Sequence, residues 1–438
     1  MTFASRAHPG DQVSFREALF SGLAPDGGLY HPVERPDLAK LFASFSDATP
    51  FLGLSGAMCA AFLAPEIDEA RARRIASRAF IFDPVLRRLD ERILLLELFH
   101  GPTCAFKDFG ARFLASAMED FLQEEKRSVR VLVATSGDTG SAVAHAFHGQ
   151  QNIDVVILYP SGRVSDLQEK QLTTLGGNVH ALEVGGSFDD CQRLVKDAFR
   201  DPGLRARLGL TSANSINVGR LLPQCLYYAF AATRRSELGA DAPTICVPSG
   251  NFGNLTAGVY AWHWGLPVRR FIAATNVNDV VPRYLSEGRF APRPSEKTLS
   301  NAMDVGNPSN FERLEVVFGG DWTRMASIIA GAAVTDARTL RTMREIRASH
   351  GVFVDPHTAV GCAAARDFLA RAGHRGSDQV IVLSTAHPGK FAETVREATG
   401  EEPEMPERLA RCLALPKRAT RIGTGFPELS DFLLGTFG

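Results

Sequence analysis

The sequence predicts an α/β fold of two open, mostly parallel, doubly wound sheet domains, preceded by a mostly helical section. Three observations support this prediction. Short apolar runs without alternation, such as 131–134 and 155–159, indicate strands that are buried on both faces. Helical patterns separate these runs along the chain, as parallel strands require. At 438 residues, the chain is also long enough for two or three domains that each bury a core.

The pattern of elements divides the chain into four parts. Residues 1–95 form the helical section, 96–215 a smaller α/β domain, 216–400 a larger α/β domain and 401–438 a tail with helical pieces. The expected strands are 93–99, 131–134, 155–159, 179–184, 244–247, 270–274 and 380–383. The expected helices are 15–23, 67–80, 139–147, 165–175, 188–200, 221–238, 254–264, 325–333, 340–349 and 391–399. Open sheets bind ligands at the carboxyl ends of their strands, so we expect the site in the cleft between the two sheet domains.

Composition and charge exclude several classes of function. The chain has 45% hydrophobic and 22% charged residues, and its net charge of −1 offers no electrostatic footprint for nucleic acid or a membrane surface. Residues 1–10 lack the apolar core of a signal peptide, and no apolar run reaches membrane-spanning length. The seven cysteines are scattered without CxxC spacing, which favours reduced thiols and argues against structural zinc. We therefore expect a cytoplasmic protein that binds no nucleic acid, membrane or metal.

Lys107 occupies an unusual place for an ammonium group. It lies between Phe106 and Phe109, shortly after the apolar run 93–96. A lysine kept from water has a lowered pKa, and a neutral amine is a nucleophile. A surface lysine beside Asp108 is the ordinary alternative. However, the chain has eight lysines and 40 arginines, so it uses arginine wherever a positive charge suffices. This usage raises the possibility that position 107 needs an amine.

Two Gly-rich turns follow predicted strands and contain residue types that hold anions. The turn 134–141 offers backbone N–H groups at a helix start, and it is explained equally well as a helix cap made by Asp138 or Thr139. The turn 247–256 contains Gly250 and Gly253, each followed by an asparagine, between a strand and a helix. This second turn lacks the P-loop and GxGxxG patterns, and its position favours a phosphate cradle.

Two further polar segments bear on the chemistry. The turn 383–390 offers Ser384 and Thr385 as donors to a buried acceptor, although taken alone it favours an ordinary strand-ending turn. The segment 212–220 gathers hydroxyl, amide and guanidinium groups at the expected hinge between the domains, where a second anion could bind. A nucleophilic lysine, a phosphate cradle and a hydroxyl donor on an α/β scaffold together indicate a pyridoxal phosphate enzyme.

The sequence resembles the threonine synthase family, in its longer bacterial and fungal branch. The resemblance is carried by 100–112, the turn 136–140, the segment 214–217 and the loops 248–254 and 384–391, and it extends from the Gly27-Gly28-Leu29-Tyr30 turn to about residue 400. It implies a fold type II enzyme, related to the β subunit of tryptophan synthase, that uses pyridoxal 5'-phosphate. The implied reaction converts O-phospho-L-homoserine and water to L-threonine and phosphate, in the last step of threonine biosynthesis. We expect a monomer or a homodimer.

The resemblance also implies roles for individual residues. Lys107 would be the Schiff-base lysine and the general base, and Thr385 would hydrogen-bond the pyridine nitrogen. Asp138 would lie at the cofactor's ring hydroxyl, where many relatives carry Asn; an acid donates a hydrogen bond there only when it is protonated. The cofactor phosphate would be held by Gly250, Asn251, Phe252, Gly253 and Asn254. The substrate would be bound by Thr135, Ser136 and Thr139 at its carboxylate and by Asn214, Ser215 and Arg220 at its phosphate.

Two alternative functions remain open at this stage. A serine or threonine dehydratase, or a phospho-lyase that releases a keto acid, would share the fold and the lysine. A dehydratase substrate carries no phosphate for Arg220 to bind, which favours the main prediction. A binder of phosphate ligands without catalytic activity would need no nucleophilic amine, so Lys107 argues against it.

Overall fold

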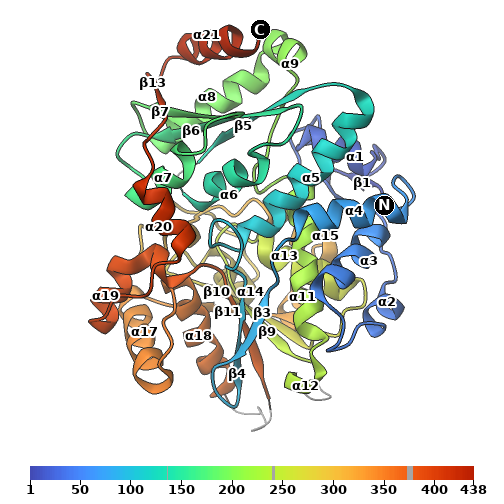
Figure 1. The fold of residues 1–438 in the computed structure, drawn as a ribbon. Helices are drawn as coiled ribbons and strands as arrows, with labels where there is room; N and C mark the ends of the chain where they lie inside the picture. Colours follow the sequence, from blue (N-terminus) through green and yellow to red (C-terminus); the bar gives the residue numbers. More distant parts are fainter. Residues whose placement is uncertain (136, 239–241, 372–377) are drawn as a thin grey trace.

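The computed structural model describes residues 1–135, 137–238, 242–371 and 378–438, and within them it contains two large sheets (Figure 1). The six-stranded sheet has the order β11-β10-β9-β12-β4-β3, and the five-stranded sheet has the order β13-β7-β6-β5-β8. In the first sheet only the edge strand β3 is antiparallel, and in the second all the described pairings are parallel. The predicted fold class is therefore confirmed.

The six-stranded sheet draws its strands from both halves of the chain. Its members are β3 (Val85–Arg88), β4 (Ile93–Glu97), β9 (Thr244–Pro248), β10 (Arg270–Thr275), β11 (Ile329–Ala333) and β12 (Val380–Ser384). The helices and turns of this half are α10 (Val218–Leu221), η1 (Leu222–Gln224), α11 (Cys225–Ala232), α12 (Arg235–Leu238), α13 (Gly253–His263), α14 (Val280–Glu287), η2 (Asn301–Met303), α15 (Phe311–Phe318), α16 (Trp322–Ile328), α17 (Asp336–His350), α18 (Pro356–Leu369), η3 (Pro388–Phe391) and α19 (Ala392–Thr399).

The five-stranded sheet forms the upper half of the molecule in Figure 1. Its strands are β5 (Val129–Ala134), β6 (Ile153–Pro160), β7 (Val179–Val184), β8 (Leu210–Thr211) and, from the tail, β13 (Thr420–Ile422). The helices of this half are α5 (Lys107–Glu125), α6 (Asp138–Phe147), α7 (Asp166–Thr173), α8 (Phe188–Arg200) and α9 (Pro202–Leu208). The tail adds α20 (Glu407–Ala414) and α21 (Phe426–Phe437), which lies near α8 and α9 (Figure 1).

The N-terminal section is mostly helical, as predicted, and it supports α5. It consists of a small antiparallel pair, β1 (Phe3–Ala4) and β2 (His31–Pro32), with α1 (Phe15–Ser21), α2 (Ala39–Ala43), α3 (Phe51–Leu63) and α4 (Glu69–Ala79). Phe51 on α3 and Phe80 lie with their ring centroids 5.6 and 6.3 Å from that of Phe109 on α5. Edge-to-face and tilted aromatic contacts of this kind fix the rings in place. The first turn of α5 is thus anchored in the core.

Two predicted helices differ from the structure. The run 325–333 was expected to be one helix, but α16 ends at Ile328, and 329–333 forms β11 at the edge of the six-stranded sheet, paired in parallel with β10. Gly331 explains this in part, because a side chain there would meet the Cα of Pro282 on α14 at 2.7 Å. The run 221–238 is divided into the end of α10, η1, α11 and α12, and Pro223 in η1 accounts for the interruption between α10 and α11.

Candidate active site

Three of the predicted site segments follow neighbouring strands. Strands β9, β12 and β4 are adjacent and parallel, so their carboxyl ends meet at one edge of the six-stranded sheet. The glycine loop (249–254), the β12 turn (385–390) and the lysine stretch (100–112) leave the sheet at this edge. The sheet order therefore brings together segments that are as much as 290 residues apart in the sequence.

The lysine stretch and the β12 turn are bonded to each other through their backbones. The N–H of Phe106 donates to the carbonyl of Thr385 at 2.8 Å, and the N–H of His387 donates to the carbonyl of Cys104 at 3.1 Å. Ala105 and Ala386 form an isolated antiparallel bridge between these two bonds. Thr385 is buried, and its hydroxyl makes no hydrogen bond to any residue that the structure describes, so it is free to bind a ligand.

Lys107 is the first residue of α5, and its side chain is 17% exposed. Its Nζ lies 5.6 Å from the ring centroid of Phe106 and 3.8 Å from Oδ2 of Asp138. Burial lowers the pKa of Lys107; the positive charges of Lys390 and Arg220 act in the same direction, and Asp138 opposes them. The positive end of the α5 dipole also disfavours an ammonium group at this position. Lys107 is thus poised to lose its proton, as a nucleophilic lysine must be.

The turn after β5 presents Asp138 to this lysine. The helix cap is made by neither Asp138 nor Thr139: the hydroxyl of Thr135 accepts from the N–H groups of Gly137 and Gly140, at 3.1 and 2.9 Å. Asp138 is therefore free to face the lysines. Burial alone would raise the pKa of Asp138, but the charges of Lys390 and Lys107 outweigh burial and hold it below its ordinary value. Thr139 is partly buried on the first turn of α6, and Ser136 lies outside the described residues.

The glycine loop ends at a helix start without a side-chain cap. Phe252 has φ of 61°, in the left-handed region, and α13 begins directly after it. Oδ1 of Asn254 accepts from the hydroxyls of Tyr227 and Tyr228, at 2.7 and 2.8 Å. Nδ2 of Asn254 is buried and has no partner among the described residues. A buried, unpartnered donor at an uncapped helix start is a site that a phosphate group fits.

The glycines of this loop serve the fold as well. A Cβ at position 250 would lie 2.6 Å from the carbonyl oxygen of Ala302, so Gly250 lets the loop pass against η2. At position 253 the nearest atom, Nδ2 of Asn310, would be 3.3 Å away. The close approach that requires glycine at position 250 is thus to the protein's own backbone.

The segment 212–220 lies beside the glycine loop. Nδ2 of Asn251 donates to Oγ of Ser215 at 3.2 Å, which joins this segment to the loop. Arg220 is buried and donates through Nη1 to the carbonyl of Ala213 at 2.8 Å, while its Nε has no partner among the described residues. Burial lowers the pKa of Arg220 to about 10. Asn214 is only partly buried, on the turn before α10, and its side chain makes no hydrogen bond to the described residues.

Two features of the site were missed from the sequence. Lys390, in the β12 turn, places its Nζ 2.7 Å from Oδ1 of Asp138. The scarcity of lysine that singled out Lys107 applied equally to Lys390. Behind the turn, the hydroxyl of Thr358 contacts Ser384 at 2.9 Å and donates to Asp355, the N-cap of α18. The sequence Asp355-Pro356 is a helix-start signal that could have located α18.

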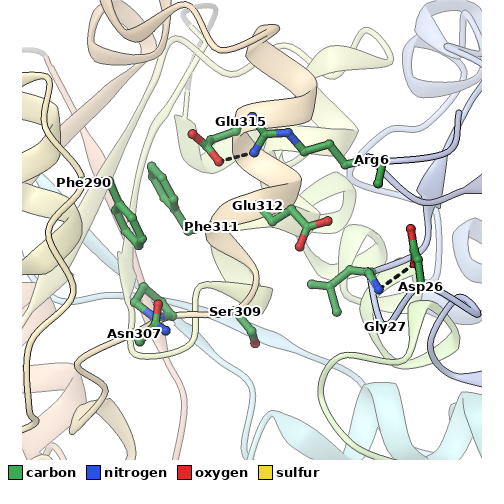
Figure 2. A pocket seen from close by; sticks show the side chains of 13 residues that line it. Arg6, Asp26, Gly27, Phe290, Asn307, Ser309, Phe311, Glu312 and Glu315 are labelled. Atoms are coloured by element: carbon green, nitrogen blue, oxygen red, sulfur yellow. Dashed lines mark hydrogen bonds and ion pairs between the residues drawn. The ribbon is translucent and has the colours of Figure 1, made fainter.

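A pocket of about 790 Å³ adjoins the site (Figure 2). It lies between the N-terminal section and the segment 290–315, and the ion pair of Arg6 and Glu315 spans one side of it (Figure 2). Ser309, which lines the pocket, donates through its N–H to Oδ1 of Asn251 at 2.7 Å. Lys107 is not among the residues that line it. The pocket therefore borders the glycine loop and is distinct from the lysine centre.

Metal sites and membrane-spanning helices are absent from the described part of the chain. It contains no group of three or more His, Cys, Asp or Glu side chains that could hold a metal ion. Within the same residues, each helix is too short or too polar to cross a membrane. All seven cysteines lie in the described residues, and each is buried and unpaired.

Comparisons with known proteins match this chain to one family. Three family models match: threonine synthase N terminus over 2–80, pyridoxal-phosphate dependent enzyme over 83–386, and threonine synthase, C-terminal, over 358–432. The chain is 44% identical to a threonine synthase of Serratia marcescens over 425 residues, which is 97% of each chain. It is 43% identical to that of Escherichia coli over 424 residues, also 97% of each chain.

Solved structures give the same result. The crystal structure of a threonine synthase from Brucella melitensis with bound pyridoxal phosphate matches with a TM-score of 0.92 at 35% identity, covering 100% of this chain and 99% of that one. The Escherichia coli structure matches with a TM-score of 0.88 at 41% identity, covering 100% of both chains. A tomato threonine deaminase matches with a TM-score of 0.56 at 16% identity over 75% of this chain and 90% of its own, which shows a shared fold alone.

Proposed function

The chain belongs to the threonine synthase family of pyridoxal phosphate enzymes, and on that premise we propose how its own residues carry the reaction. The reaction is that of the family: O-phospho-L-homoserine and water give L-threonine and phosphate, by replacement across Cβ and Cγ. The geometry that carries the proposal is a largely buried lysine side chain, 17% exposed, at a helix start beside a carboxylate, where three strand-end segments meet.

Lys107 would hold the cofactor, and its nitrogen would also move protons at Cα and Cβ of the substrate. The pyridoxal group, when bound, supplies an electron sink for the charge that develops at Cα. A base acts best when its pKa is near the working pH, and the lowered pKa of Lys107 supports this role. The buried hydroxyl of Thr385 would bind the pyridine nitrogen, and this neutral partner would leave the ring less electron-withdrawing than an acid would.

Two unpartnered buried donors support two separate phosphate sites. Nδ2 of Asn254 and the uncapped start of α13, with the loop 250–254, hold the cofactor phosphate. Nε of Arg220, with Asn214 and Ser215, binds the substrate phosphate and orients it for departure from Cγ. The contact of Asn251 with Ser215 fixes the position of one site relative to the other. Thr135, Ser136 and Thr139, around the start of α6, bind the substrate carboxylate, and Asp138 lies at the cofactor's ring hydroxyl.

The same proposal covers the location, the oligomeric state, the partners and the domain boundaries. We infer a cytoplasmic enzyme, a monomer or a homodimer, that binds no nucleic acid or membrane. We also retain the division at residues 95, 215 and 400. Strands β5–β8 lie within 96–215 and β9–β12 lie within 216–400, which supports it. Three strands cross these boundaries: β3 and β4 join the six-stranded sheet, where β4 pairs with β12, and β13 joins the five-stranded sheet beside β7.

The test is to incubate the purified protein, loaded with pyridoxal phosphate, with O-phosphohomoserine and to measure threonine and inorganic phosphate together. We expect equal amounts of both. Lys107→Ala should lower the rate by at least about 10²-fold, because a positioned base and covalent attachment are both lost. It should also abolish the cofactor linkage that borohydride reduces. Lys40→Ala, which removes an exposed lysine on α2, is the matched control and should change neither.

Two outcomes would contradict the proposal. Phosphate released with a keto acid and without threonine would indicate the phospho-lyase alternative. A reducible cofactor linkage that persists in Lys107→Ala would assign the attachment to another lysine, and Lys390 would be the first to examine.

A further inference from the structure

A second lysine shares the carboxylate of Asp138 with Lys107. Lys390 belongs to η3, and its side chain is only 1% exposed. Its Nζ donates to the carbonyl of Thr103 at 2.9 Å and lies 2.7 Å from Oδ1 of Asp138. The other carboxylate oxygen, Oδ2, faces Nζ of Lys107 at 3.8 Å. Each oxygen of Asp138 thus faces a different lysine nitrogen, and the closer contact is to Lys390.

The charges around this centre come from several elements. Lys107 and Asp108 lie on α5, Asp138 and His145 on α6, Arg220 on α10 and His357 on α18. Asp138 is in direct ionic contact with Lys107 and with Lys390. Cys104 and Cys412 also lie near Lys390, and burial keeps the pKa of both thiols raised, so they add no negative charge.

The charge balance within the trio of Lys107, Lys390 and Asp138 decides which lysine loses its proton. If all three groups are ionised, the trio has one excess positive charge in a buried place, which is unfavourable. Lys390 has a close ion pair, which requires its ammonium form, and it donates to a carbonyl, which an ammonium group does more strongly than a neutral amine. Among the described residues, Lys107 has a longer contact to Asp138, at 3.8 Å, and the ring of Phe106, 5.6 Å from its Nζ. The favoured state therefore has an ionised Asp138–Lys390 pair and a neutral Lys107.

We propose that Lys390 is a positioning residue that neutralises Asp138 and fixes its orientation, so that the nitrogen of Lys107 stays easy to deprotonate. This inference rests on the proposed role of Lys107. Without Lys390, the carboxylate of Asp138 has no other counter-charge, so it stabilises a positive charge on the Lys107 nitrogen. The directions of the pKa shifts agree, since Lys390 acts to lower the pKa of both Lys107 and Asp138.

The test uses the cofactor-loaded enzyme and two readouts. The first is the pH at which its visible absorbance changes, which follows protonation of the Lys107 nitrogen without turnover. The second is the pH profile of kcat/KM. Lys390→Met should move the absorbance transition to higher pH by at least about 1 unit, because a neighbouring carboxylate loses its counter-charge. Asp138→Asn should move the absorbance transition to lower pH, because the carboxylate that attracts a positively charged Lys107 nitrogen is lost.

The double variant and a control separate this role from a structural one. Asp138→Asn combined with Lys390→Met should have its transition closer to the wild type than Lys390→Met alone, because the two changes are coupled through one ion pair. Lys417→Met is the matched control: it removes a lysine from the carboxylates of Glu169 and Glu183, and it should leave the transition unmoved.

The outcomes are distinguishable from failure of the proposed function. If Lys107→Ala keeps its reducible linkage, the assignment of Lys107 is wrong and the inference fails with it. If Lys107 is the attachment site, but Lys390→Met lowers only the melting temperature and leaves the transition unmoved, Lys390 is merely structural and the inference is overturned. Should Lys390→Met not fold, an unmoved transition in Asp138→Asn would overturn the inference equally.

Discussion

Asp108 and Asp138 are both buried near Lys107, and their different partners give their carboxyl groups opposite properties. Asp138 lies between two lysines, which hold its pKa below the ordinary value. Asp108 accepts from the N–H and the hydroxyl of Thr103, at 2.8 and 2.7 Å, and so closes the loop that precedes α5. Burial outweighs these bonds and raises the pKa of Asp108 to about 6, from an ordinary value of 3.8. At the residue scale, counter-charge decides which acid stays ionised.

Replacing Asp108 should change how stability depends on pH. A raised pKa means that the native state holds the proton more tightly than the unfolded chain does. The stabilising contribution is therefore complete below about pH 4 and is lost as the pH rises through about 6. Asp108→Asn keeps an acceptor for Thr103 and cannot ionise. Between about pH 4 and 7, the free energy of unfolding of the wild type should fall by up to about 3 kcal/mol relative to that of this variant.

The measurement is urea unfolding of both proteins across this pH range. Only the difference between the two free energies of unfolding matters, because other carboxyl groups titrate in both proteins. A difference that stays constant with pH would show that Asp108 does not hold a raised pKa.

At the scale of elements, Gly110 sets the distance between the helix of Lys107 and that of Arg220. A Cβ at position 110 on α5 would lie 2.5 Å from the carbonyl oxygen of Arg220 on α10. Such a contact is with backbone, which cannot swing aside as the end of a side chain can. The absence of a side chain at this one position thus keeps the lysine and the arginine in the same site.

Gly110→Ala should therefore destabilise the protein, although alanine is favoured over glycine in helices. Overpacking of this kind costs about 1–3 kcal/mol, against a gain of about 0.5–1 kcal/mol in helix propensity. Displacement of α10 should also raise KM for O-phosphohomoserine. Gly435→Ala on α21 is the control: a Cβ there meets nothing within 4 Å, so stability should stay the same or rise. Equal stability changes in the two variants would contradict the role given to Gly110.

Local sequence patterns predicted the helices and strands whose own residues carry the signal. They failed where the conformation of a segment depends on a partner that is distant in the sequence. The strand 179–184 and the helix 188–200 have the expected bounds, because each carries a full period of apolar residues or a capping serine. The segment 329–333 forms a strand that pairs with β10, a partner 54 or more residues away in the sequence that no local pattern could reveal. The same limit applies to the site: the lysine stretch and the glycine loop were visible as motifs, but nothing local indicated that Lys390 would meet Asp138.

At the scale of the whole molecule, the tail connects the two sheet domains. It leaves the larger domain after α19, and Arg408 on α20 donates to the carbonyl of Phe99 at 3.1 Å, just before the lysine stretch. Further along, Lys417 pairs with Glu183 at 2.8 Å, and β13 extends the five-stranded sheet beside β7. Finally, α21 packs on α8 and α9 at the top of the molecule (Figure 1). The tail thus runs from the larger domain, past the start of the lysine stretch, to the smaller domain.

Weakening the far anchor of the tail should therefore lower the stability of the whole protein. Leu429 on α21 is fully buried in the core of the smaller domain, so Leu429→Ala should cost about 2–5 kcal/mol in the free energy of unfolding. Leu413 on α20 is 40% exposed, and Leu413→Ala should change stability by about 0.5 kcal/mol or less. Urea unfolding of the two variants measures the difference. If they unfold alike, α21 contributes no anchorage, and the tail must be held chiefly by the ionic contacts of Lys417 and Arg408.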